Sequence, residues 1–169
     1  HRDGEDHTIE RPRDYQFWRD YVPQLQPPWT GKLLSWSCPH PQTLKRRDLF
    51  FDPQAEASNG HGLNLWIYRR IADPANFAPG AYASGITLVN WPQNDYWLGD
   101  LLSAPATERE RYLQQAKQLS LSWLYWMQTE APRADGAQGW QGLRLRKDIV
   151  AKNDGLAKYP YIRASRRFD

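Results

Sequence analysis

Cysteine and the branched aliphatic residues are scarce in this sequence. Of 169 residues one is cysteine, Cys38, so no disulfide can form within the chain, which excludes a disulfide-framed secreted module. A reducing, cytoplasmic compartment is the expectation that follows. Leu, Ile, Val and Phe together supply only 32 residues, close to the level at which chains become disordered. Nine Trp and nine Tyr make up the deficit, because each large aromatic side chain buries ~150–250 Å².

Long hydrophobic runs and a strong net charge are also absent. The longest apolar candidate covers residues 119–127, well short of the ~18 residues that cross a bilayer, and no signal-peptide pattern opens the chain. We therefore expect no membrane partner. The 22 basic and 19 acidic residues are interspersed and leave a net charge of +3, which argues against a nucleic-acid partner.

The familiar phosphate, nucleophile and metal motifs are missing from these residues. There is no Gly-x-Gly-x-x-Gly fingerprint, no P-loop and no Gly-x-Ser-x-Gly elbow. Zinc sites need clustered ligands, and Cys38 and the four histidines show no paired spacing, so no metal site is expected.

The two ends indicate a single unit, 1–169, cut from a longer polypeptide. The first residue is not Met, and the polar, mixed-charge start predicts a linker over residues 1–13. At the other end, residues 159–168 have the pattern of a strand with no tail after it. We therefore expect part of the whole protein to lie outside this chain.

Two helices stand out. The first is short, over residues 14–22, and ends before Pro23. The second is long, over residues 108–131, with a predicted capping box formed by Thr107 and Glu110 and with Pro132 after its last turn. Its second half is apolar nearly all round, which predicts that it is buried against this chain or a partner.

Short strands account for most of the remaining pattern. Alternation is clearest over residues 63–71, and a short helix is expected over 96–102. The other strands are expected at 32–37, 48–52, 85–90, 143–146 and 159–168. The fold class predicted is α+β, with a short mixed or antiparallel sheet, one long buried helix and one or more short helices.

The segment 90–97 is the richest in functional groups and follows a predicted strand, where sites are often found. Asp95 and Tyr96 are candidates for proton transfer, and Asn90, Trp91 and Asn94 for binding substrate. The structural alternative is a proline-fixed turn with Asn94 or Asp95 as a helix cap and the indoles in the core.

His40 is the third catalytic candidate. It lies between two prolines, so a stiff backbone would present an imidazole that titrates near neutrality and could act as a general base. The alternative is an ordinary loop histidine.

Arginines crowd the C-terminal segment at Arg163, Arg166 and Arg167. Their guanidinium groups suit bidentate recognition of phosphate or carboxylate, so they are candidates for contact with a cofactor or an acidic substrate. The alternative is the solvated face of a strand.

Several unusual stretches occur together in one order. Through these stretches the sequence resembles the large family of FAD-dependent oxidoreductases whose flavin domain has the glutathione-reductase type of fold. The stretches that carry the resemblance are residues 31–36, 65–71, 86–96, 118–122, 128–133, 142–146 and 159–167.

The resemblance implies the interior, substrate-side or cap region of such an enzyme. It implies FAD as cofactor, bound mainly by a flavin-binding domain or subunit that this chain lacks, and a small organic molecule as substrate. The family pattern Arg-Glu-Ser-Arg-Arg has alanine in place of glutamate at Ala164, so a carboxylate contact expected there is lost. The leading expectation is thus the substrate-side portion of an FAD-dependent oxidoreductase, inactive by itself. The alternative is a non-catalytic, aromatic-rich module that binds sugar or peptide.

Overall fold

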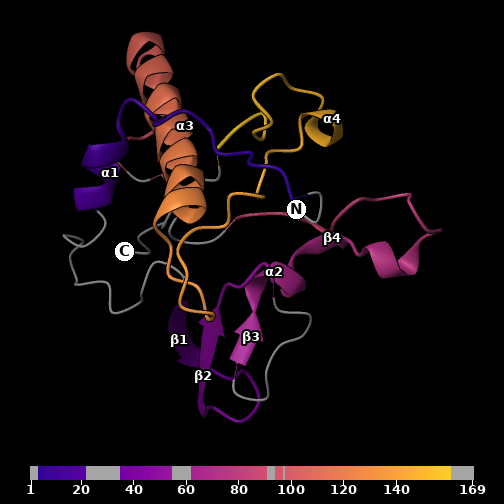
Figure 1. Cartoon of the computed structure of the whole chain (residues 1–169). Coiled ribbons are helices and arrows are strands. Elements are labelled where there is room, and N and C mark those ends of the chain that lie inside the picture. The colour runs from indigo at the N-terminus through magenta and orange to yellow at the C-terminus, as the bar shows by residue number, and fades with distance from the viewer. Residues whose placement is uncertain (1–3, 22–34, 55–61, 91–93, 97, 161–169) are drawn as a thin grey trace.

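The long helix expected over residues 108–131 is α3, Ala106–Thr129, the longest element in the described part of the chain (Figure 1). The computed structural model describes residues 4–21, 35–54, 62–90, 94–96 and 98–160, without the side chains of 35–38. Helix α1, Tyr15–Tyr21, packs beside α3. The remaining described elements are β1 (Ser35–Pro39), β2 (Arg46–Phe50), β3 (Gly62–Asn64), α2 (Leu65–Tyr68), β4 (Arg70–Ala72), η2 (Pro74–Asn76), β5 (Ile86–Thr87) and α4 (Lys147–Val150).

The strands form two small sheets. β2 pairs with β1 in antiparallel and with β3 in parallel orientation, and β4 pairs with β5 in antiparallel orientation. The described part of the chain therefore has the predicted α+β class, with a short mixed sheet, one long helix and several short ones.

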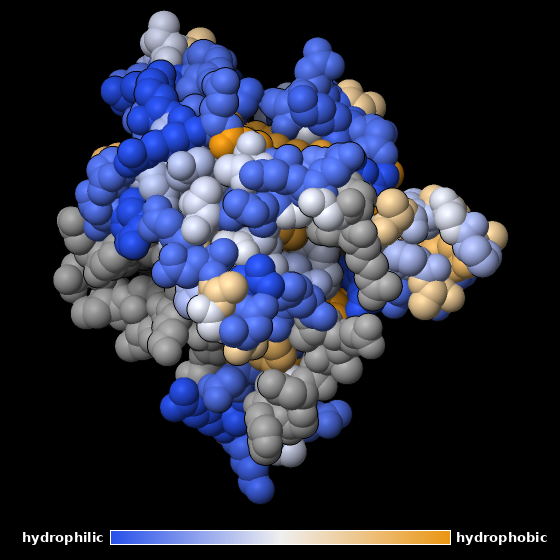
Figure 2. Space-filling view, viewed as in Figure 1, coloured by the Kyte–Doolittle hydropathy of each residue, from blue (hydrophilic) through white to orange (hydrophobic). Residues whose placement is uncertain are grey.

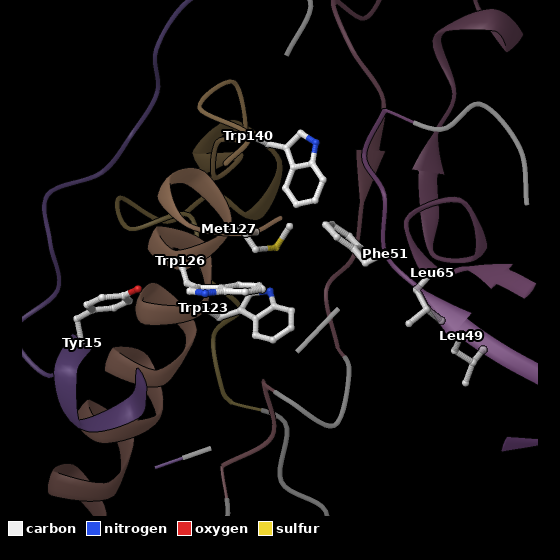
Figure 3. Close-up of a cluster of buried hydrophobic side chains, with 9 residues drawn as sticks. Tyr15, Leu49, Phe51, Leu65, Trp123, Trp126, Met127 and Trp140 are labelled. Atoms are coloured by element: carbon white, nitrogen blue, oxygen red, sulfur yellow. The ribbon is translucent and has the colours of Figure 1, made fainter. Parts of the chain in front are cut away.

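The main hydrophobic core joins the C-terminal half of α3 to α1, to the first sheet and to the segment after α3 (Figure 3). Trp123, Trp126 and Met127 enter it from α3, and Phe51 packs edge-on against Trp140 with ring centroids 6.3 Å apart. The apolar second half of α3 is thus buried, as its pattern predicts. The core comprises Tyr15, Leu49, Phe51, Leu65, Trp123, Trp126, Met127, Ala131 and Trp140.

A second, smaller core lies between α1 and the first half of α3. Trp18 from α1 packs against Tyr96, with ring centroids 6.3 Å apart, and the two rings form one cluster with Ala116 and Leu119 of α3. These contacts fix α1 on the helix.

The predicted strand 63–71 is wrong in its middle. Residues Leu65–Tyr68 form α2 because the Asn64 side chain accepts a hydrogen bond from the Trp66 backbone N–H and caps the turn. Period-two alternation therefore describes only the flanking strands, β3 and β4.

Three further local predictions are wrong. Residues 143–146 form no strand and lead into α4, and no helix forms over the described residues of 96–102, where Asp100 Oδ1 accepts from the backbone N–H groups of Leu102 and Ser103 in a turn. The capping box does not form, because α3 begins after Pro105 without a side-chain cap bond. Most of the predicted strand 159–168 lies outside the described residues.

The segment from β4 to β5 projects from the rest of the described chain as a lobe (Figure 1). In the space-filling view its surface shows tan, apolar side chains among pale blue ones, on a face that is otherwise largely hydrophilic (Figure 2). Ile71 and Phe77 are exposed there, and Arg70 Nη1 contacts Asp73 Oδ2 at 2.6 Å at its base. No helix in the described ranges combines the length and apolarity that a membrane crossing requires.

Candidate functional site

Tyr96 packs between α1 and α3, and Asp95 precedes it in the chain. The Tyr96 side chain is completely buried, and its hydroxyl donates a hydrogen bond to Gln115 Oε1 at 2.6 Å. Burial raises the pKa of Tyr96, so the phenol is held neutral. Asp95 is buried beside it at 6% exposure. Tyr96 belongs to the small core and Asp95 is buried next to it in the sequence, and their catalytic roles stay predictions.

His40 lies in the turn between β1 and β2. Its Nδ1 accepts from the backbone N–H groups of Gln42 and Thr43, both at 3.3 Å, which leaves Nε2 as the protonated nitrogen of the neutral ring. The turn is at the end of the sheet far from α3 (Figure 1), whereas Tyr96 packs on α3. The structure therefore does not bring His40 together with Asp95 and Tyr96.

The predicted binding residues are only partly described. Asn90 and Asn94 are half-buried, and Asn94 Oδ1 has no hydrogen-bond partner in the described part of the chain. Trp91, Arg163, Arg166 and Arg167 lie outside the described residues.

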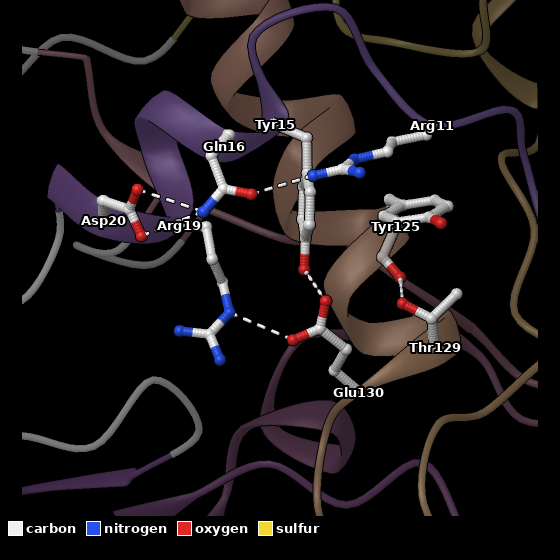
Figure 4. A network of polar contacts seen from close by, with 8 residues as sticks. All are labelled: Arg11, Tyr15, Gln16, Arg19, Asp20, Tyr125, Thr129 and Glu130. Atoms are coloured by element: carbon white, nitrogen blue, oxygen red, sulfur yellow. Dashed lines mark hydrogen bonds and ion pairs between the residues drawn. The ribbon is translucent and has the colours of Figure 1, made fainter.

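A polar cavity of about 370 Å³ opens between α1 and the C-terminal end of α3. Figure 4 shows its side chains converging from the N-terminal segment, from α1 and from the last turns of α3. The residues that line it are Arg11, Tyr15, Gln16, Arg19, Asp20, Tyr125 and Glu130.

Glu130 is the centre of one hydrogen-bond network in this cavity. The Tyr15 hydroxyl donates to its Oε1 at 2.5 Å, and Arg19 Nε donates to its Oε2 at 3.0 Å. The hydrogen bond from Tyr15, and then the hydrogen bond and the charge of Arg19, lower the pKa of Glu130 against the opposing effect of burial. Burial and the bond to Glu130 raise the pKa of Tyr15 well above its ordinary value of 10.0. The wall therefore holds an ionised carboxylate beside a neutral phenol.

A second network joins Arg11, Gln16 and Asp20. Arg11 Nη2 donates to Gln16 Oε1 at 2.8 Å, and the Arg11 guanidinium lies over the Tyr15 ring at 5.2 Å. Gln16 Nε2 in turn donates to both oxygens of Asp20, at 3.1 and 3.0 Å. Two guanidinium groups and two carboxylates thus line one cavity.

The Arg19 guanidinium is the group best placed to meet a ligand. It hydrogen-bonds to Glu130 through Nε, and its two terminal nitrogens point away from that carboxylate (Figure 4). Its side chain is 42% exposed, so solvent reaches it. A guanidinium held in this way presents a planar pair of N–H donors, the geometry that recognises carboxylates.

This cavity is not among the sites predicted from the sequence, although the sequence carries one signal for it. Arg11, Tyr15 and Arg19 recur every four residues, so once α1 forms, Tyr15 and Arg19 share one face. Nothing in the local pattern shows that Glu130, more than a hundred residues later, lies opposite that face.

The described residues do not fit the phosphates of FAD. A dinucleotide pyrophosphate is bound by backbone N–H groups where a glycine turn joins a strand to a helix. In the described ranges the one long helix, α3, begins after Pro105 and follows a turn instead of a strand. Nor do three His, Cys, Asp or Glu side chains in these ranges cluster as metal ligands would.

Comparison with known proteins gives the family. The family described as FAD dependent oxidoreductase matches residues 7–169, nearly the whole chain. The chain belongs to this family of FAD-dependent oxidoreductases. No curated protein and no solved structure matches it.

Proposed function

We propose that this chain forms the substrate-side portion of an FAD-dependent oxidoreductase, with the flavin held mainly by a domain or subunit outside these residues. The family match over residues 7–169 carries the proposal. Two features support the substrate-side role: the sequence has no dinucleotide fingerprint, and a cavity of small-molecule size is lined by hydrogen-bonding side chains.

In the whole enzyme the flavin would supply the redox chemistry, and residues of this chain would bind and orient an organic substrate. Arg11 and Arg19 offer donors, and Glu130 and Asp20 offer acceptors. Asp95, Tyr96 and His40 are proposed for proton transfer or orientation, and Arg163, Arg166 and Arg167 for contact with the cofactor or an acidic substrate.

Burial of the indoles speaks against the alternative of an aromatic-rich binding module. Among the tryptophans whose side chains are described, Trp18, Trp123, Trp126 and Trp140 are at most 8% exposed. A module that stacks rings on sugars or peptides needs those rings at its surface.

Flavin content tests the proposal. We expect the chain, expressed with the sequence that flanks it in its polypeptide or with its flavin-binding subunit, to be yellow and to carry about one FAD per protein, whereas the 169-residue chain alone stays colourless. A colourless extended protein that rejects added FAD, or stoichiometric FAD binding by the chain alone, would contradict the proposal.

A further inference from the structure

We propose that the cavity between α1 and α3 binds a small hydroxylated carboxylic acid, whose carboxylate is held by the terminal nitrogens of Arg19. This inference rests on the proposed function in one respect: it names the substrate class that the substrate-side portion would take.

The Arg19 guanidinium is already oriented for a ligand. Glu130 accepts from its Nε at 3.0 Å, which fixes the plane of the guanidinium while leaving the two terminal nitrogens directed away (Figure 4). A carboxylate can accept from both of them in a parallel pair of charge-assisted hydrogen bonds. Because the group is already oriented, little conformational entropy is lost when a ligand binds.

The charges of the described lining favour a monoanion. Among these residues Arg11 and Arg19 are matched in number by Asp20 and Glu130. A dianionic phosphate would therefore lie near two carboxylates, with two guanidinium groups among the described lining residues to offset them. A monoanion needs only the local field of Arg19.

The cavity lining also contains hydrogen-bond acceptors for hydroxyl groups. The Glu130 and Asp20 carboxylates and the Gln16 amide oxygen carry lone pairs that suit the O–H donors of an alcohol. A cavity of about 370 Å³ equals roughly a dozen water volumes at ~30 Å³ each, enough for a small polar acid. Hydroxyl groups on the ligand would therefore find partners beside the carboxylate.

Calorimetric titration of the 169-residue chain tests the inference without flavin. The probes are glycerate, gluconate and glucuronate, with glucose for hydroxyls lacking a carboxylate and inorganic phosphate for a different anion. We expect saturable binding of at least one of the three acids, no binding of glucose, and weak or no binding of phosphate. In the wild-type chain the NMR signal of the Arg19 Nε–H should shift on titration with that acid.

Arg19→Lys keeps the charge and removes the planar donor pair, so the affinity for the acid should fall by at least about tenfold. Arg13→Lys is the matched control, because Arg13 is 74% exposed, pairs with Asp14 and does not line the cavity. It should leave the affinity unchanged. Thermal melting of both variants reports whether α1 still packs on α3.

The inference is overturned if none of the three acids binds to the folded chain, if glucose or phosphate binds as tightly as the acid, or if Arg19→Lys binds the acid as the wild type does. None of these results alters the flavin content of the extended protein, so the two proposals fail separately.

Discussion

A single amide, Gln128, joins three parts of the chain. It is completely buried; its Oε1 accepts from the Ile9 backbone N–H at 3.1 Å, and its Nε2 donates to the backbone oxygens of His7 and Leu143, both at 2.7 Å. The N-terminal segment, the end of α3 and the segment after it therefore share one side chain. Residues 7–9 of the expected linker are tied to α3 by these bonds.

Gln128→Ala should lower the free energy of unfolding by about 3 kcal/mol, because three part-buried backbone groups lose their partner at ~1–3 kcal/mol each, less what water recovers. Urea denaturation measures the loss. Gln114→Ala on the same helix is the control, since Gln114 is exposed and its side chain donates to the exposed Glu110, and it should cost less than ~0.5 kcal/mol. An equal loss of unfolding free energy in the two variants would contradict the stabilising role given to Gln128.

Glu130 makes the free energy of unfolding depend on pH. Because the folded state lowers its pKa, the carboxylate stabilises the fold above the ordinary value of 4.5, and that contribution disappears as the pH falls through the lower folded value. The difference in unfolding free energy between wild type and Glu130→Gln should therefore shrink as the pH is lowered below 4.5.

The Tyr15 hydroxyl is the largest cause of this shift, so the same comparison in a Tyr15→Phe background should show a weaker pH dependence. Denaturant unfolding over a series of acidic buffers measures both pairs. A difference that stays constant across the series would contradict the assignment.

At the scale of elements, the two helices were predicted best, because the spacing of apolar residues along a helix is visible in the sequence. Helix 108–131 corresponds to α3, and helix 14–22 to α1, because apolar and aromatic residues recur at helical spacing and prolines limit the ends. α2 was missed because a side-chain cap from Asn64 decides it, and alternation carries no information about such a bond. The cavity was missed because Glu130 meets α1 only after the chain has folded.

The turn after α3 depends on Gly139. Its φ is +70°, and a Cβ there would overlap the Gln128 backbone carbonyl. Gly139→Ala should destabilise the chain by about 3 kcal/mol or more, because overlap adds to the strain of the left-handed conformation.

Gly136→Ala in the same turn is the matched control. Its φ is +82° but a Cβ would meet open space, so only the strain of about 1 kcal/mol applies. Thermal or urea unfolding compares the two variants, and a Gly139→Ala that costs no more than Gly136→Ala would contradict the packing described for this turn.

At the scale of the whole molecule, two cores hold α1 against α3, and a polar cavity lies between α1 and the C-terminal end of α3. The chain is a member of the FAD-dependent oxidoreductases, yet its described residues offer no cradle for a dinucleotide. A division between a flavin-holding part and this substrate-side part accounts for both facts.

A crystal structure of the extended, FAD-loaded protein tests that division most directly. The division predicts that the pyrophosphate contacts only residues outside this chain, and that the reactive ring of the flavin faces side chains of this chain. A pyrophosphate held by this chain's backbone, or a flavin ring remote from all of its residues, would contradict it.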